Sequence, residues 1–212
     1  MKIALNNNAT QSETVYVPGS LYTISTDPMN HGRITTTEPL KSLDEVKRVR
    51  AVLQNDPRGF ALFCLGVNSA LRASDILKLK RSDLKENELF LREKKTRKLR
   101  RITLNDLTVT AIQAYLATRT DVHEWMFIGQ RGKMTHGYFG KLVKTWFAEA
   151  GVSPGQYATH SLRKTFVRLQ HEVFGVSLGT LMTCLNHSTE AQTLQYVGLN
   201  AKDVATTYAN EI

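Results

Sequence analysis

A histidine and an arginine stand three residues apart in the segment Thr159-His-Ser-Leu-Arg163. The segment is predicted to start a helix, where residues three apart lie on the same face. An arginine guanidinium offers a planar fork of N–H donors to two phosphate oxygens, and an imidazole exchanges protons near neutral pH. His160 and Arg163 are therefore a candidate phosphate site, although so short a pattern also arises by chance.

Three other segments carry residue types that the same chemistry needs. Upstream, Ser69-Ala-Leu-Arg-Ala-Ser-Asp-Ile-Leu-Lys-Leu79 contains Arg72. Downstream, Leu185-Asn-His-Ser188 is followed by Tyr196, which comes nine residues after the histidine. Between them, Glu93-Lys-Lys-Thr-Arg-Lys98 forms a basic turn that joins two predicted strands.

In order and separation, these segments resemble the tyrosine recombinase, or phage integrase, family. Its catalytic domain carries an Arg-x-Ser-Glu box, a basic β-hairpin, a His-x-Leu-Arg box and a Leu-Gly-His-Ser segment followed by a tyrosine. The resemblance covers roughly residues 42–200 and implies a mainly α fold with a small antiparallel β-hairpin or sheet (α+β). The chain departs from the family pattern at Asp75 (usually Glu), Lys164 (usually His) and Asn186 (usually Gly).

By position, the resemblance assigns six catalytic residues: Arg72, Lys95, His160, Arg163, His187 and Tyr196. It implies that Tyr196 is the nucleophile, that His160 assists proton transfer at the tyrosine, and that His187 donates a hydrogen bond to the phosphate. Asp75 is expected to hold Arg72 or a histidine in place by a charge-assisted hydrogen bond. The implied 3′-phosphotyrosyl link preserves the energy of the broken bond, so no metal, cofactor or ATP is expected.

The residue types suit attack on a DNA phosphodiester. Displacement puts further negative charge on the nonbridging oxygens, so fixed cationic donors lower the barrier. A tyrosine hydroxyl, with an ordinary pKa near 10, must lose its proton, and the leaving 5′ oxygen must gain one. Each such proton transfer contributes roughly 10²- to 10⁴-fold to the rate.

The basic turn offers more than one lysine as the acid for the leaving oxygen. The run Lys95-Thr-Arg-Lys98 resembles the family's Lys-Thr-Gly-Lys hairpin, whose first lysine has that role. We therefore predict Lys95 as the acid, with Lys94 as the alternative. The remaining cations of the turn are predicted to contact the DNA backbone and position the duplex: Lys94, Arg97, Lys98 and Arg100.

The elements that must position these residues are mostly helices. Ser42 and Glu45 form a capping box at the start of the helical part. The predicted helices span residues 42–53, 60–71, 73–79 (capped by Ser74), 105–119, 135–150, 161–173, 177–185, 188–197 and 200–212. The predicted strands span residues 88–92, 100–104 and 125–128.

Composition favours a globular protein with a polyanionic partner. The 212 residues are 42% hydrophobic and carry a formal net charge of +9, which favours double-stranded DNA once the motifs are considered. Cys64 and Cys184 lie in apolar runs and are expected to be core thiols. No apolar run approaches the length of a membrane span. The protein is predicted to be cytoplasmic, nucleoid-associated and not bound to membranes.

The predicted organisation is an arm or linker over residues 1–41, a catalytic domain over 42–199 and a tail helix over 200–212. Within the arm, Pro18-Gly19 lies between two β-prone runs, which indicates either a small hairpin or a disordered arm. Most family members carry a further helical DNA-binding domain here, so a compact enzyme and a truncated chain are both open. The tail helix is expected to dock either in cis or on a neighbouring subunit.

The resemblance implies a homotetramer on paired DNA sites and a monomer when free. Within the same chemistry, type IB topoisomerases and hairpin telomere resolvases share a similar pocket. A non-catalytic DNA-binding protein of the same fold is the alternative from another class. The complete residue set argues against that alternative, because binding needs cations but not a tyrosine at this position.

Overall fold

The computed structural model describes residues 12–17, 20–25, 37–93 and 98–197. The chain divides into two units, residues 1–36 and 37–212. In the first unit, β1 (Ser12–Val17) and β2 (Ser20–Ser25) pair antiparallel. Of the two alternatives for this segment, the structure therefore has the paired strands, and the Pro18-Gly19 turn lies outside the described residues.

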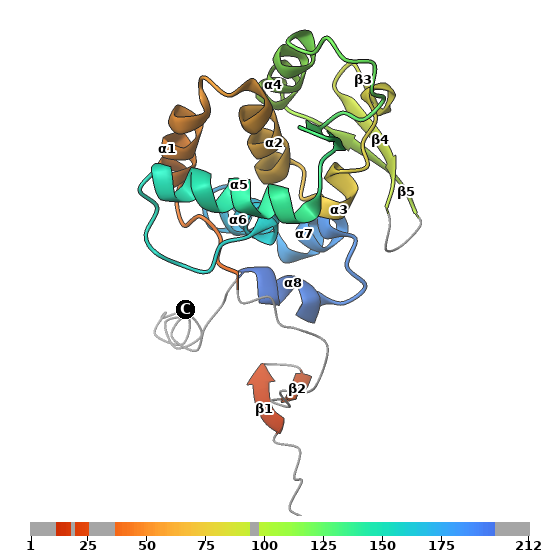
Figure 1. Ribbon diagram of the computed structural model, residues 1–212. Coiled ribbons are helices and arrows are strands. Elements are labelled where there is room, and N and C mark those ends of the chain that lie inside the picture. The colour runs from red at the N-terminus through yellow and green to blue at the C-terminus, as the bar shows by residue number, and fades with distance from the viewer. Residues whose placement is uncertain (1–11, 18–19, 26–36, 94–97, 198–212) are drawn as a thin grey trace, which may run out of the picture. The chain divides into compact units, whose positions relative to one another are not determined.

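The second unit is mainly helical, as predicted (Figure 1). Its helices are α1 (Leu43–Leu53), α2 (Pro57–Asn68), α3 (Ala73–Ile76), α4 (Asp106–Ala117), α5 (His136–Glu149), α6 (Thr159–Glu172), α7 (Leu178–Leu185) and α8 (Glu190–Val197). α2 packs against α4 and α6, and α6 also contacts α5, α7 and α8. α6, which carries the His-x-Leu-Arg motif, is therefore central to this unit. None of the helices described is long and apolar enough to cross a membrane.

The strands of the second unit form two small antiparallel sheets. A 3-10 turn, η1 (Arg81–Asp83), leads into a sheet of order β3 (Leu84–Lys85), β4 (Glu88–Arg92) and β5 (Leu99–Thr103). A second sheet pairs β6 (Ile128–Gly129) with β7 (Gly132–Lys133). Side chains alternate along β4, where Leu89 and Leu91 are buried. Glu93 continues that inward-facing series and is also buried.

Side-chain caps fix where most helices begin. Ser42 accepts a hydrogen bond from the Glu45 amide (3.2 Å), and Asn105, Thr135 and Ser177 cap later helices in the same way. The prediction of a helix over residues 60–71 is wrong by three residues at each end. Asp56 caps α2, and Pro57 stands at its first turn, where a missing N–H costs nothing.

Two other predicted elements differ in the structure. Ser74 does not cap α3, because Arg72 is the N-cap residue. The predicted strand over residues 125–128 is present only at its ends, where Trp125 forms an isolated antiparallel bridge with Lys80 and Ile128 begins β6. Between them, the carbonyls of Trp125 (2.6 Å) and Met126 (2.9 Å) accept hydrogen bonds from the Arg119 side chain. The predicted helix over residues 200–212 lies outside the described residues.

The contact between α2 and α6 depends on a residue without a side chain. A Cβ at Gly66 would lie 2.6 Å from Cδ1 of the buried Leu162. We expect Gly66→Ala to lower the free energy of unfolding by about 1–3 kcal/mol through overpacking. Gly140→Ala is the matched control, because nothing lies within 4 Å of that position, and it should raise stability by about 1 kcal/mol. Urea unfolding measures both, and equal stability of the two variants would contradict this packing.

Candidate active site

Arg163 is a buried cation held by main-chain carbonyls. Its residue is 1% exposed, and its guanidinium donates to the carbonyls of Ala70 and, at 2.8 Å, of Leu185. Burial and the nearby charge of Arg72 lower the pKa of Arg163 to about 10. That value still leaves the guanidinium charged at neutral pH. Arg163 thus lies between the turn before α3 and the end of α7.

The side chain of Tyr196 lies next to both His160 and Arg163. Its hydroxyl oxygen lies 2.6 Å from Nε2 of His160, and its ring lies 5.7 Å from the guanidinium carbon of Arg163. Burial, followed by the charges of Arg163 and Lys164, lowers the pKa of His160 to about 4. The imidazole is therefore neutral at pH 7 and can accept the tyrosine proton.

His187 completes this group. Its Nε2 lies 3.3 Å from Nη2 of Arg163, and its Nδ1 lies 3.1 Å from the hydroxyl of the buried Thr193. Its ring centroid is 5.2 Å from that of Tyr196. The preceding Asn186 ends α7 in the left-handed conformation (φ 52°). Asparagine is among the few residues that tolerate this region, so it can replace the glycine of the family pattern.

Arg72 approaches the group from the start of α3. Its Nη1 lies 3.2 Å from Oε2 of Glu93. The charge of Arg72 lowers the pKa values of both His160 and Arg163. Two arginines that disfavour each other's charge would both be stabilised by an anion between them, which is the electrostatic character of a phosphate site.

Glu93 was missed by the sequence analysis. Its carboxylate, 0% exposed, binds Arg72, Arg100 and Asn186. The available signal was the alternation of β4, because Leu89, Leu91 and Glu93 fall on the same inward face.

The basic turn is described only in part. Lys94, Lys95 and Arg97 lie outside the described residues. Lys98 is exposed, and its carbonyl accepts a hydrogen bond from the Glu93 amide (3.1 Å). Arg100 is directed inward, to Glu93 and the Cys184 carbonyl, and its contact with the DNA backbone stays a prediction.

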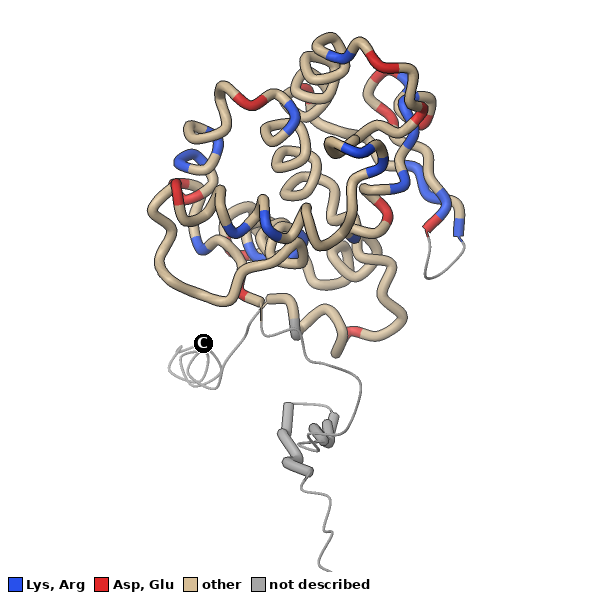
Figure 2. Tube along the Cα trace, in the orientation of Figure 1, with Lys and Arg blue, Asp and Glu red and all other residues tan. Residues whose placement is uncertain are grey.

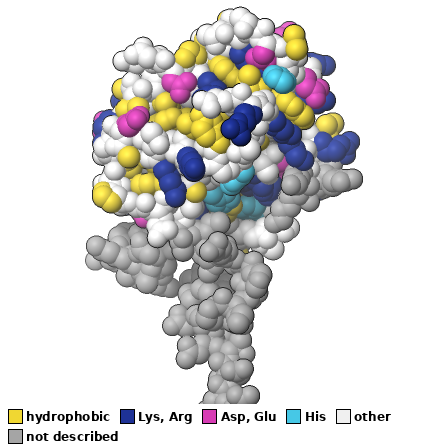
Figure 3. All heavy atoms as spheres, viewed as in Figure 1, with side chains coloured by type: hydrophobic (Ala, Val, Ile, Leu, Met, Phe, Trp, Pro, Cys, Tyr) yellow, Lys and Arg dark blue, Asp and Glu magenta, His cyan; other side chains and the backbone are white. Residues whose placement is uncertain are grey.

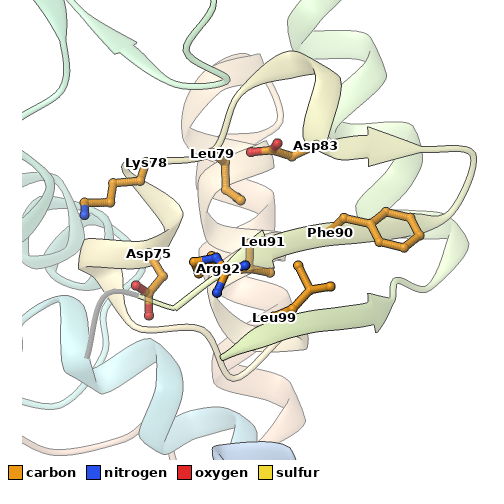
Figure 4. A pocket seen from close by; sticks show the side chains of 8 residues that line it. All are labelled: Asp75, Lys78, Leu79, Asp83, Phe90, Leu91, Arg92 and Leu99. Carbon is orange, nitrogen blue, oxygen red and sulfur yellow. The ribbon is translucent and has the colours of Figure 1, made fainter. Parts of the chain in front are cut away.

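The other two departures from the family pattern have distinct surroundings. Lys164 donates from Nζ to the carbonyl of Thr37 (2.7 Å), which anchors the start of the second unit on α6. Asp75 is 2% exposed and lines a pocket of about 320 Å³ between α3 and the β4–β5 hairpin (Figure 4). The same pocket is lined by Lys78 and Arg92. That Asp75 holds Arg72 or a histidine in place stays a prediction.

Lys and Arg recur along two elements of the second unit. Figure 2 shows them where β4 ends and β5 begins, and along α5. On the face seen in Figure 3, histidine side chains gather beside Lys and Arg. Within the described part of the chain, no three His, Cys, Asp or Glu side chains are grouped to hold a metal ion.

The low pKa of His160 predicts a pH dependence of stability. The unfolded chain takes up a proton near the ordinary pKa of 6.5, whereas the folded chain does so only near 4. The contribution of the neutral His160 is thus fully present above pH 6.5 and is lost as the pH falls from 6.5 to 4. We expect His160→Gln to lose less stability than wild type between pH 7 and pH 4.5 in urea unfolding. Equal losses would show that His160 is not buried as a neutral ring.

Comparison with known proteins gives a consistent result. The model of the phage integrase family matches residues 42–203. A probable integrase/recombinase of Bacillus subtilis (strain 168), YoeC, is 29% identical over 175 residues, which are 81% of this chain and 94% of the relative. Tyrosine recombinase XerC of Caldanaerobacter subterraneus subsp. tengcongensis is 30% identical over 144 residues, which are 66% of this chain but 40% of that relative.

Solved structures share the fold. A crystal structure of XerA recombinase has a TM-score of 0.70 at 23% identity, and the matched region covers 81% of this chain and 65% of the XerA chain. XerH recombinase in a post-cleavage complex with a palindromic difH substrate has a TM-score of 0.67 at 18% identity. The matched region covers 88% of this chain and 56% of the XerH chain. The motifs, the fold and the family match agree, and the chain belongs to the phage integrase family.

Proposed function

We propose that this chain is a site-specific DNA recombinase that cuts and rejoins strands through a 3′-phosphotyrosyl intermediate at Tyr196. The observation that carries the proposal is the 2.6 Å separation between the Tyr196 hydroxyl and Nε2 of a neutral His160, beside Arg163. A nucleophile within hydrogen-bond reach of a base is the arrangement that covalent catalysis requires.

The proposed cleavage step uses one base and one acid. The Tyr196 oxygen attacks the scissile phosphorus while its proton moves to His160. The bond from phosphorus to the 5′ oxygen breaks, and that oxygen takes a proton from Lys95. Arg72, Arg163 and His187 donate hydrogen bonds to the nonbridging oxygens as negative charge develops there. The reverse step, from a second strand's 5′ hydroxyl, needs neither a metal nor ATP.

Several supporting roles belong to the same proposal. Asp75 helps to hold Arg72 or a histidine in place, and Lys94, Arg97, Lys98 and Arg100 act at the DNA backbone. The partner is double-stranded DNA near the nucleoid, on which four copies assemble at paired sites. The catalytic domain spans residues 42–199. The solved complexes of XerH with difH are consistent with a DNA partner.

The nucleophile is tested with a nicked DNA substrate that traps the covalent complex. Wild type should give a protein–DNA adduct on a denaturing gel, and the adduct should persist in EDTA. Tyr196→Phe should give none, because the ring remains but the attacking oxygen is gone. Tyr138→Phe is the matched control and should behave as wild type. The Tyr138 hydroxyl accepts a hydrogen bond from Arg58 and has no role in the proposed reaction.

An adduct from Tyr196→Phe would overturn the assignment of the nucleophile. Loss of the adduct in EDTA would contradict the metal-independent step. Exchange of strands between two DNA sites, as opposed to simple resealing, separates a recombinase from a topoisomerase.

The role of Arg72 is tested by Arg72→Ala. Removing one fixed donor to a developing oxyanion should slow adduct formation by about 10²- to 10³-fold, whereas DNA binding should weaken little. Arg101→Ala is the matched control, since Arg101 is exposed and pairs with Glu88 across the β4–β5 hairpin. A rate for Arg72→Ala within about tenfold of the control would remove Arg72 from the phosphate clamp.

A further inference from the structure

Glu93 is a fully buried carboxylate, and its partners among the described residues come from separate parts of the chain. Its Oε2 accepts hydrogen bonds from Nη1 of Arg72 (3.2 Å) and from the Asn186 amide (2.9 Å). Its Oε1 accepts from Nη1 of Arg100 (2.8 Å). The Glu93 side chain is 0% exposed, and those of Arg72 and Arg100 are 19% and 15% exposed. A carboxylate so deeply buried is stable only because both of its oxygens are engaged by cations or N–H donors.

These partners belong to the segments that carry the proposed catalytic groups. Arg72 begins α3, Arg100 lies in β5, and Asn186 ends α7 and directly precedes His187. Arg100 also donates to the Cys184 carbonyl in the last turn of α7. Glu93 thus connects the end of β4 both to Arg72 and to the segment that carries His187.

Asn186 has two functions at this junction. Its backbone adopts a left-handed φ of 52°, which glycine supplies in the family pattern. Its side chain, which glycine lacks, donates to Glu93. The asparagine at position 186 therefore supplies both the left-handed backbone and a hydrogen bond to the carboxylate at position 93.

We infer that Glu93 is a positioning residue that holds Arg72 and the end of α7 in the geometry for phosphate cleavage. This inference rests on the proposed function. A guanidinium has five N–H donors, and the contact with Glu93 engages Nη1 alone, so the carboxylate orients Arg72 without replacing the phosphate. Loss of the carboxylate should therefore slow the chemical step and leave DNA affinity nearly unchanged.

The test measures the rate of adduct formation at saturating nicked DNA, together with the Kd for intact DNA and the urea unfolding midpoint. Glu93→Gln keeps the side-chain volume but loses the charge. Its rate should fall about 10- to 100-fold, as for a lost charge-assisted hydrogen bond, with the Kd within about threefold of wild type. Glu88→Gln is the matched control, because Glu88 pairs with Arg101 in the same hairpin (2.7 Å) and is given no role in the proposed site. Its rate should stay within about twofold of wild type.

Asn186→Gly provides a second variant that keeps the left-handed backbone and removes the side-chain donor to Glu93. Its rate should fall about threefold to tenfold at unchanged Kd, which keeps the inference testable if Glu93→Gln fails to fold. Rates for Glu93→Gln and Asn186→Gly equal to that of Glu88→Gln would overturn it. So would a faster Glu93→Gln, which would mean that the carboxylate competes with phosphate, or a parallel fall in rate, DNA affinity and unfolding midpoint. If wild type itself forms no adduct, the proposed function fails first, and the inference falls with it.

Discussion

The guanidinium of Arg163 lies in the interior of the fold and is held by the carbonyls of Ala70 and Leu185. A buried charge is costly unless it is hydrogen-bonded, so these two carbonyls must be kept in place. Ala70 adopts a left-handed φ of 54° there, at a cost of roughly 1–2 kcal/mol for an L-residue. The two carbonyls precede Arg72 and His187 by two residues each. Satisfying one buried cation thus brings both of these segments to α6.

The arginines of this region favour a bound anion, and the carboxylate of Glu93 neutralises only part of their positive charge. Arg72 and Arg163 disfavour each other's charge, and both act with burial to keep His160 neutral. Glu93 offsets the charges of Arg72 and Arg100. The Tyr196 side chain is instead next to Arg163 and His160. A phosphodiester placed there would meet the cations that are not fully neutralised, while the neutral imidazole remains able to take a proton.

The sequence predicted the helical fold and the grouping of His160, Arg163, His187 and Tyr196, because each belongs to a motif whose spacing survives in the fold. It could not predict Glu93, whose partners are remote in the chain, although the alternation of β4 marked an inward acid. The boundaries of α2 differ from the predicted ones because the helix begins at the Asp56 cap and Pro57, ahead of the apolar run that starts at Phe60. The segment over residues 125–128 is only partly extended because the carbonyls of Trp125 and Met126 accept hydrogen bonds from the Arg119 side chain, a contact that β propensity does not contain.

The central claim is that the Tyr196 oxygen becomes bonded to the 3′ phosphate of DNA. Mass spectrometry of the trapped adduct tests it most directly. Digestion after Arg168 and Lys202 releases a peptide of residues 169–202 in which Tyr196 is the sole tyrosine. After nuclease treatment, the account predicts that this peptide carries a nucleotide joined through its 3′ phosphate to Tyr196. A nucleotide on any other residue, or attachment through a 5′ phosphate, would contradict the account.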